Sequence, residues 1–260
     1  MARTVSHERP LSVVVLGNSV AVLSIPGRTG ADDGTYAEVL RDRLAAAGVP
    51  VRVAQEGRWF DFAVKGFKRY QESVRRHLPD VVVLQYGLNE SQPWLLPVPV
   101  VRHLVTDHEV ATRTGQLYRH HVAYPVWRRI RTYRRWAAPK VGMRTWQTTP
   151  RRFGEVMKQL VRAIRYDSRP LVLVLDVNAP GEVLRHFLPG MDERHAVVQR
   201  TLREVVDSFA DPEVRLVEAS VACAQAGDDA SADGMHYSPL GHRVVGELLA
   251  DEVLAWLGRG

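Results

Sequence analysis

Short apolar segments alternate with amphipathic segments along most of the chain. Five apolar runs rich in β-branched residues predict strands, most of them buried on both faces, at 11–16, 51–54, 80–86, 171–177 and 214–217. Helices are predicted between and after them by apolar residues that recur every three or four positions, at 35–47, 65–78, 152–165, 195–209 and from 238 onward. This order predicts an α/β fold, a three-layer α/β/α sandwich around a parallel sheet of about five strands.

Two of these helices have clear start signals. Thr35 and Glu38 have the spacing of a capping box, in which the Glu side chain reaches back to the first backbone N–H groups. Ser238 and Pro239 combine an N-cap with a proline in the first turn. Both signals set the expected beginning of a helix.

The stretch 91–150 breaks the alternation and is too long for an ordinary connection. It contains four of the six tryptophans and several prolines. We interpret it as an insertion after the third strand, partly helical around 126–136, which caps or walls a pocket. The chain 1–260 is otherwise expected to form a single domain.

Charge is unevenly distributed along the chain. Residues 101–152 contain 12 Lys and Arg against 2 Asp and Glu, a local balance of +10, so the remainder carries −4 of the total of +6. Three interpretations of these arginines stay open: they face water on a cap, they form an electropositive entrance for an anionic substrate, or they bind a nucleic acid or a membrane surface. Trp127, Arg128 and Arg131 are the substrate-binding candidates in this stretch. No nucleic-acid reader pattern is present, so no nucleic-acid partner is expected.

Cysteine and histidine usage narrows the chemistry further. The single cysteine, Cys223, excludes an intrachain disulfide framework and a cysteine-based metal cluster. The adjacent His120 and His121 lack carboxylates at suitable spacing and are expected on a solvated surface, so neither a metal nor a cofactor is predicted. The first apolar run is too short for a membrane span or a signal segment. We expect a soluble, cytoplasmic protein and leave its oligomeric state open.

Three short motifs lie where predicted strands end or where the last helix begins. They are Gly17-Asn18-Ser19, Gly87-Leu88-Asn89-Glu90 and Asp233-Gly234-Met235-His236. Ligands of parallel sheets bind at the carboxyl ends of the strands, so these motifs are expected to meet there. Each motif alone has an ordinary explanation as a cap, a turn or a surface loop.

Together the three motifs supply the groups that acyl transfer requires. Ser19 would attack a carbonyl carbon, and His236 would accept its proton as general base. Asp233 would orient and stabilise the imidazole, and Asn89 would donate a hydrogen bond to the oxyanion. The spacing of Asp233 and His236 lets one short loop hold both groups.

These motifs resemble the blocks of the SGNH/GDSL hydrolases, a family of esterases, lipases, deacetylases and some acyltransferases. Gly17-Asn18-Ser19 resembles its Gly-Asp-Ser block, Gly87-Leu88-Asn89-Glu90 its Gly-x-Asn-Asp block, and 233–236 its Asp-x-x-His block. The resemblance implies a flavodoxin-like sandwich, a Ser19-His236-Asp233 triad and an oxyanion hole formed by Ser19, Asn89 and a glycine after the second strand. Gly57 is the candidate for that glycine.

The sequence departs from the family pattern at three places. Asn18 replaces the usual Asp, and its amide can still brace the nucleophile loop; it is also a candidate substrate contact. Glu90 replaces Asp, and the segment 55–60 is the weakest match to its block. The α/β-hydrolase nucleophile elbow fits less well because Ala21 occupies the position of its final glycine.

Three functions are therefore considered. The first is a serine hydrolase that cleaves a carboxylic ester, such as a small acyl group on a metabolite or sugar. The second is an acyltransferase that uses the same triad with an anionic donor, such as an acyl group on coenzyme A or a carrier protein. The third is a non-catalytic binding module on the same fold.

Overall fold

The computed structural model describes residues 9–22, 34–93, 96, 98–105, 112–141, 146–188, 190–227, 230–231 and 235–258. Within its helices, the side chains at 22, 98, 102, 105, 113, 131, 134–141, 183 and 187 lie outside the described part. The statements below concern the described residues.

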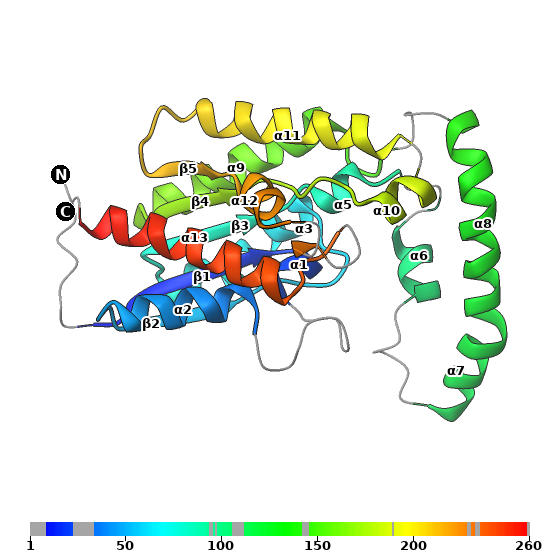
Figure 1. Cartoon of the computed structure of the whole chain (residues 1–260), viewed down its shortest axis with the longest axis horizontal. Coiled ribbons are helices and arrows are strands. Elements are labelled where there is room, and N and C mark those ends of the chain that lie inside the picture. Colours follow the sequence, from blue (N-terminus) through cyan, green and yellow to red (C-terminus); the bar gives the residue numbers. More distant parts are fainter. Residues whose placement is uncertain are drawn as a thin grey trace.

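A five-stranded parallel sheet forms the centre of the molecule (Figure 1). Its strands are β1 (Leu11–Gly17), β2 (Val51–Gln55), β3 (Val81–Gln85), β4 (Leu171–Leu175) and β5 (Val214–Val217), in the order β2-β1-β3-β4-β5. Every residue of β3 and β4 is buried, as their uninterrupted apolar sequences predict. The five predicted strands are confirmed, with β3 and β4 shorter than the apolar runs that contain them.

Helices cover both faces of this sheet, so the predicted three-layer sandwich is confirmed. On one face α2 (Tyr36–Ala46) and α12 (Ala219–Ala226) pack against α13 (Pro239–Leu257), and on the other α3 (Ala63–Lys68) and α11 (Met191–Asp207) pack against α9 (Pro150–Ser168). Four short helices lie between these larger elements: α1 (Ser19–Val22), α4 (Tyr70–Ser73), α5 (Leu88–Ser91) and α10 (Glu182–Phe187).

The single helix predicted over 65–78 is wrong. The chain forms α3, α4 and a 3-10 turn at Arg75–His77 instead. The interruption occurs at Arg69, which leaves the helical backbone conformation with φ −99° and ψ 12°. Its buried guanidinium donates to the Ser73 hydroxyl at 2.7 Å and to the carboxylate of Asp61 at 2.7 Å. Asp61 lies before α3 in the chain. A buried charge must be paired, and this requirement outweighs the periodicity of the apolar residues.

The predicted helix starts are confirmed. The Thr35 backbone N–H donates to the Glu38 carboxylate at 2.6 Å, which is the Glu half of the capping box. The Ser238 hydroxyl accepts from the Gly241 N–H at 3.1 Å at the start of α13. These contacts fix where α2 and α13 begin.

The insertion is helical over more of its length than predicted. It contains α6 (Val98–Val105), α7 (Arg113–Tyr118), a π-helical turn at Arg119–Ala123 and α8 (Tyr124–Val141). The π turn precedes Pro125, which lacks an N–H to donate to the turn before it. We refer to residues 112–141 as the arm. Figure 1 shows the arm at the end of the sheet remote from the termini.

The arm packs against α6 and α10, and a small apolar cluster joins it to the loop that follows β2. Trp127 of α8 packs against the buried Phe62 and Val101, together with Phe60 and Leu96. This cluster is separate from the main core around the sheet. No helix in the described ranges is both long enough and apolar enough to cross a membrane.

Candidate active site

The β1–α1 loop places Ser19 at the carboxyl end of the sheet. Gly17 is the last residue of β1, and only glycine fits there because a Cβ would lie 2.7 Å from the Gln85 carbonyl oxygen on the adjacent β3. Asn18 is fully buried, and its Oδ1 accepts from the Val20 N–H at 3.1 Å. Ser19 is therefore presented at the first residue of a short, braced helix.

The loop before α13 brings His236 to this serine. The Ser19 Oγ and the His236 Nε2 are 3.1 Å apart, although 217 positions separate the two residues in the chain. With the hydroxyl as donor, Nε2 is the acceptor, which is the arrangement that proton removal from Ser19 needs. The predicted nucleophile and base are thus within hydrogen-bond distance.

The third member of the predicted triad, Asp233, lies outside the described residues. A second histidine near the pair, His242, is buried in α13, and its Nδ1 accepts from the Tyr36 N–H at 3.1 Å. Burial, together with a smaller effect of the neighbouring His236, lowers the pKa of His242 to about 4. His242 is therefore neutral near pH 7 and is committed to the backbone of α2, so it is not available as the base.

The β3–α5 loop carries Asn89. Gly87 has φ +118°, and a Cβ there would lie 2.5 Å from a methyl carbon of Val177, so only glycine fits. The Asn89 Nδ2 donates to the Asp61 carbonyl at 2.7 Å. The amide predicted to bind the oxyanion is thus anchored to the loop that follows β2.

Glu90 joins the same two loops. One of its carboxylate oxygens accepts from the Ala63 N–H at 2.8 Å, and the other accepts from the Gly87 N–H at 2.9 Å. Burial raises the pKa of Glu90 to about 7, although both backbone hydrogen bonds favour the charged form. The sequence signals Glu90 only as a longer substitute for Asp, and its bridging role is visible only in the structure.

Gly57, the predicted second oxyanion donor, lies in this loop after β2. The chain returns to β1 there, because the Arg58 N–H donates to the Gly17 carbonyl at 3.0 Å. The contact with Asn89, however, is made at Asp61, directly after Phe60, whose φ is +50°. The structure therefore anchors Asn89 four positions beyond Gly57, next to a residue with an unusual backbone conformation.

Arg194 of α11 holds the other end of α5. It is fully buried, and its guanidinium donates to the Ser91 carbonyl at 2.9 Å and to the Gln92 carbonyl at 3.1 Å. Its other face stacks on the Trp146 ring, 3.7 Å from the ring centroid. Burial lowers the pKa of Arg194 to about 10. A sequence signal existed, since Arg194 falls on the apolar face of its helix between Met191 and Val198.

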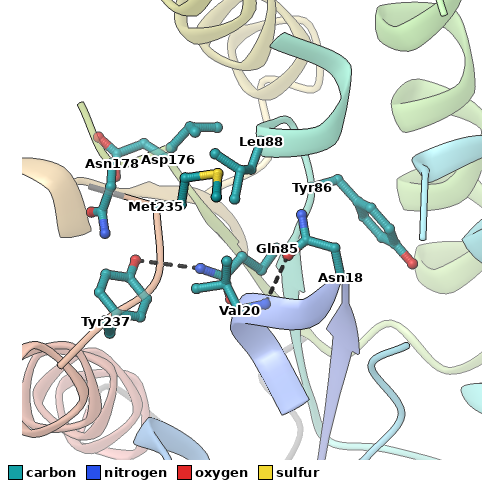
Figure 2. A pocket seen from close by; sticks show the side chains of 10 residues that line it. Asn18, Val20, Gln85, Tyr86, Leu88, Asp176, Asn178, Met235 and Tyr237 are labelled. Atoms are coloured by element: carbon teal, nitrogen blue, oxygen red, sulfur yellow. Dashed lines mark hydrogen bonds between the residues drawn. The ribbon is translucent and has the colours of Figure 1, made fainter. Parts of the chain in front are cut away.

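A small cavity of about 10 Å³ is lined by residues that flank Ser19 and His236 in the chain, and Figure 2 shows the side chains that line it. Asn18 and Val20, on either side of Ser19, and Met235 and Tyr237, on either side of His236, line this cavity. The other lining residues are Gln85, Tyr86, Leu88, Asp176, Val177 and Asn178. The Asn18 Nδ2 and both amide atoms of Asn178 are buried there without a protein hydrogen-bond partner. The volume is that of about one water molecule, so these amides face a space suited to polar contents.

Side chains from three elements hold the floor of this cavity in place. The Tyr36 hydroxyl donates to the Gln85 Oε1 at 2.8 Å, and the Gln85 Nε2 donates to the Tyr237 hydroxyl oxygen at 3.3 Å. Asp176 accepts from the Ser220 N–H at 2.8 Å and from the Ser220 hydroxyl. The loop that carries His236 is thus connected to β3 and α2 by hydrogen bonds, which limits its movement relative to Ser19.

The four predicted substrate contacts lie in different environments. Asn18 is buried in the cavity wall, and Trp127 is half-buried against Phe62 at the base of the arm. Arg128 is exposed on α8, and the side chain of Arg131 lies outside the described part. His120 and His121 form an edge-to-face ring pair. Across the described ranges, three or more His, Cys, Asp or Glu side chains do not gather into a possible metal site.

Comparisons with known proteins show the fold. No family model matches the sequence, and no curated protein matches it. Among solved structures, a lipase/acylhydrolase from Enterococcus faecalis is 18% identical, with 96% of each chain covered and a TM-score of 0.62. The acetyl xylan esterase AlAXEase is 16% identical over 94% of this chain and 100% of its own, with a TM-score of 0.58.

A third similar structure is a GDSL-like lipase from Bacteroides thetaiotaomicron. It is 12% identical over 94% of this chain and 88% of its own, with a TM-score of 0.55. The shared architecture extends over nearly the whole chain in all three cases. The predicted fold of the GDSL lipases and acylhydrolases is therefore confirmed.

Proposed function

We propose that this chain, which has the fold of the SGNH/GDSL hydrolases, is a serine hydrolase that cleaves carboxylic esters. The observation that carries the proposal is the 3.1 Å contact between the Ser19 Oγ and the His236 Nε2. In the proposed reaction, the Ser19 oxygen forms a bond to the carbonyl carbon while His236 takes the hydroxyl proton. His236 then gives this proton to the departing alcohol oxygen, and an acyl-enzyme remains.

Water completes the proposed cycle. His236 removes a proton from water, the water oxygen attacks the acyl carbon, and the Ser19 oxygen leaves with the proton as the free acid is released. Asp233 is proposed to orient the imidazole. The oxyanion is proposed to be bound by the Ser19 N–H and the Asn89 amide, with a backbone N–H of the 57–61 loop as third donor. The Asn89–Asp61 hydrogen bond favours the end of this loop near Phe60 over Gly57.

Two of the similar structures are a lipase/acylhydrolase and an acetyl xylan esterase, and this similarity supports an ester as substrate. A small acyl group on a metabolite or sugar remains the proposed substrate class. A cytoplasmic location stays a prediction from the sequence.

The decisive experiment compares Ser19→Ala with Ser208→Ala on p-nitrophenyl acetate and with a fluorophosphonate probe. Ser208 is the control because it lies at the end of α11, where its hydroxyl donates to the Val205 carbonyl at 2.7 Å. Ser19→Ala is expected to lose at least about 10³-fold in kcat and all probe labelling with an unchanged melting temperature. Full activity of Ser19→Ala would contradict the nucleophile assignment.

Acyl transfer is the second candidate, favoured by the position of the arginine-rich arm beside the loop that contacts Asn89. An acyl group on coenzyme A or a carrier protein would be the anionic donor, and an alcohol or amine would replace water as acceptor. Product analysis with such a donor separates the two reactions, because hydrolysis yields only the free acid. A binding module without catalysis is the third candidate, and absence of probe labelling at Ser19 in folded wild-type protein would favour it.

A further inference from the structure

The arm has a surface that ester hydrolysis does not require. Residues 112–141 contain eight Arg and Lys and no Asp or Glu. Among the arm side chains that the structure describes, Ala123 alone is buried. Arg128 and Arg129 are exposed on α8. A helical segment with this composition has a strongly positive surface that attracts polyanions.

Large apolar side chains are exposed on the same segment. Five of them have exposed fractions between 41% and 69%: Leu117, Tyr118, Val122, Val126 and Tyr133. On α8, Val126 and Tyr133 are seven positions apart, so they lie along one side of the helix with Ile130 between them. Arg129 is four positions before Tyr133 and therefore borders this apolar row.

The arm combines positive charge with exposed apolar side chains, and this combination indicates what kind of partner it binds. Phosphodiester backbones and small anions match the arginines but offer nothing to exposed valine and leucine side chains. An anionic bilayer matches both, since its headgroups attract the arginines and its interface accepts apolar and aromatic side chains. We propose that the arm binds the surface of anionic lipid bilayers, with the apolar row of α8 at the interface.

The attachment of the arm determines where a bound bilayer lies relative to the candidate active site. Trp127 packs on Phe62, and Phe62 directly follows Asp61, the backbone partner of Asn89. A bilayer bound to the arm therefore lies at the same end of the molecule as the carboxyl ends of the strands (Figure 1). The binding itself does not depend on the proposed catalytic role of Ser19.

The test is co-sedimentation of the full chain with vesicles of phosphatidylcholine alone and of phosphatidylcholine mixed with phosphatidylserine. Binding is expected to the mixed vesicles, to weaken as salt is raised, and to be equal for wild type and Ser19→Ala. The double change Arg128→Gln and Arg129→Gln should weaken binding roughly 30-fold, from about fivefold for each charge. The double change Val122→Ser and Val126→Ser should also weaken it.

The matched control is Arg41→Gln with Arg43→Gln, which removes the same charge from the exposed side of α2. It should leave binding within about twofold, and circular dichroism checks that every variant is folded. The proposal is overturned if the mixed vesicles do not bind, if neutral vesicles bind equally well, or if the control loses as much affinity as the arm variant. Tighter binding of a single-stranded RNA than of the mixed vesicles would also overturn it and would identify the arm as a nucleic-acid surface.

Discussion

Glu90 holds two loops of the candidate site with one buried carboxylate. Its two oxygens accept from the Ala63 and Gly87 backbone N–H groups, and these two hydrogen bonds favour the charged form. Burial opposes the charge and raises the pKa to about 7. Protonation of Glu90 weakens one of the two contacts, because the hydroxyl oxygen of a carboxylic acid is a poorer acceptor than a carboxylate oxygen. The residue therefore connects the geometry around Asn89 to pH.

This conflict predicts how stability changes with pH. The folded pKa lies above the ordinary value of 4.5, so the folded protein binds the proton more tightly than the unfolded chain does. The contribution of Glu90 to the free energy of unfolding is therefore complete below pH 4.5 and is lost as pH rises through about 7, by about 3 kcal/mol. Urea unfolding between pH 4.5 and pH 8 measures it.

The variant Glu90→Gln should remove this part of the pH dependence, whatever its effect on absolute stability. Glu155→Gln is the control, because Glu155 is a half-exposed carboxylate on α9 that pairs with Arg151 at 3.1 Å. An unchanged pH dependence in Glu90→Gln would show that the carboxylate does not titrate in this range. Loss of activity in the same variant should stay below the roughly 10²–10³-fold cost of deleting an oxyanion donor.

At the scale of elements, α5 illustrates how a very short helix is positioned. Four residues cannot form a stable helix by themselves, because the entropy lost in ordering the first turn exceeds the stabilisation from its hydrogen bonds. The N-terminal end of α5 is held by Glu90, and its C-terminal carbonyls at Ser91 and Gln92 are held by Arg194. Asn89 lies between these two supports, so its position depends on both.

Arg194 is thus a positioning residue for Asn89, and Arg194→Met should lower kcat by about 10-fold or more with little change in KM. Arg194→Lys keeps the charge but cannot reach both carbonyls with the same fork, so it should fall between wild type and Arg194→Met. Steady-state kinetics on p-nitrophenyl acetate measures the split.

Leu160→Ala serves as the stability-matched control for this comparison. Leu160 is fully buried on α9, and its truncation should cost about 2–5 kcal/mol of stability without changing kcat below the melting temperature. Equal losses of kcat in Leu160→Ala and Arg194→Met would mean that Arg194 acts through general stability alone.

The whole molecule consists of a sheet core and an arm that differ in how they are held. The core contains fully buried strands, whereas the arm is mostly exposed and is held by α6, α10 and the small cluster at Phe62, Val101 and Trp127. Segments with few buried contacts open at lower free energy than the core does. The arm should therefore open without global unfolding.

Limited proteolysis tests this separation. Trp127→Ala should increase trypsin cleavage at the arginines of the arm several-fold while shifting the melting temperature little. Leu173→Ala, in the centre of the fully buried β4, should instead cost about 2–5 kcal/mol of global stability. A large drop in melting temperature for Trp127→Ala would show that the arm and the core unfold together.

The site residues differ in how far the sequence could identify them. Ser19, Asn89 and His236 could be found because short motifs surround them, and the structure places Ser19 and His236 in contact. Arg194 and the 60–61 backbone were missed, since their roles arise from contacts between elements distant in the chain. The helix over 65–78 was wrong for the same reason: the partner of Arg69 lies before the helix, at Asp61.

The sequence by itself determined the five strands and the long helices around them, because apolar periodicity is a local property that decides which segments bury one face or two. It thereby specified a parallel sheet covered by helices on both sides, and the chemical groups available at its carboxyl edge. The tertiary structure alone decided the distances: that Ser19 and His236 meet, that Glu90 and Arg194 hold α5, and that the arm leaves its apolar row exposed. These depend on which buried polar groups pair across the fold, and no local pattern records such pairings.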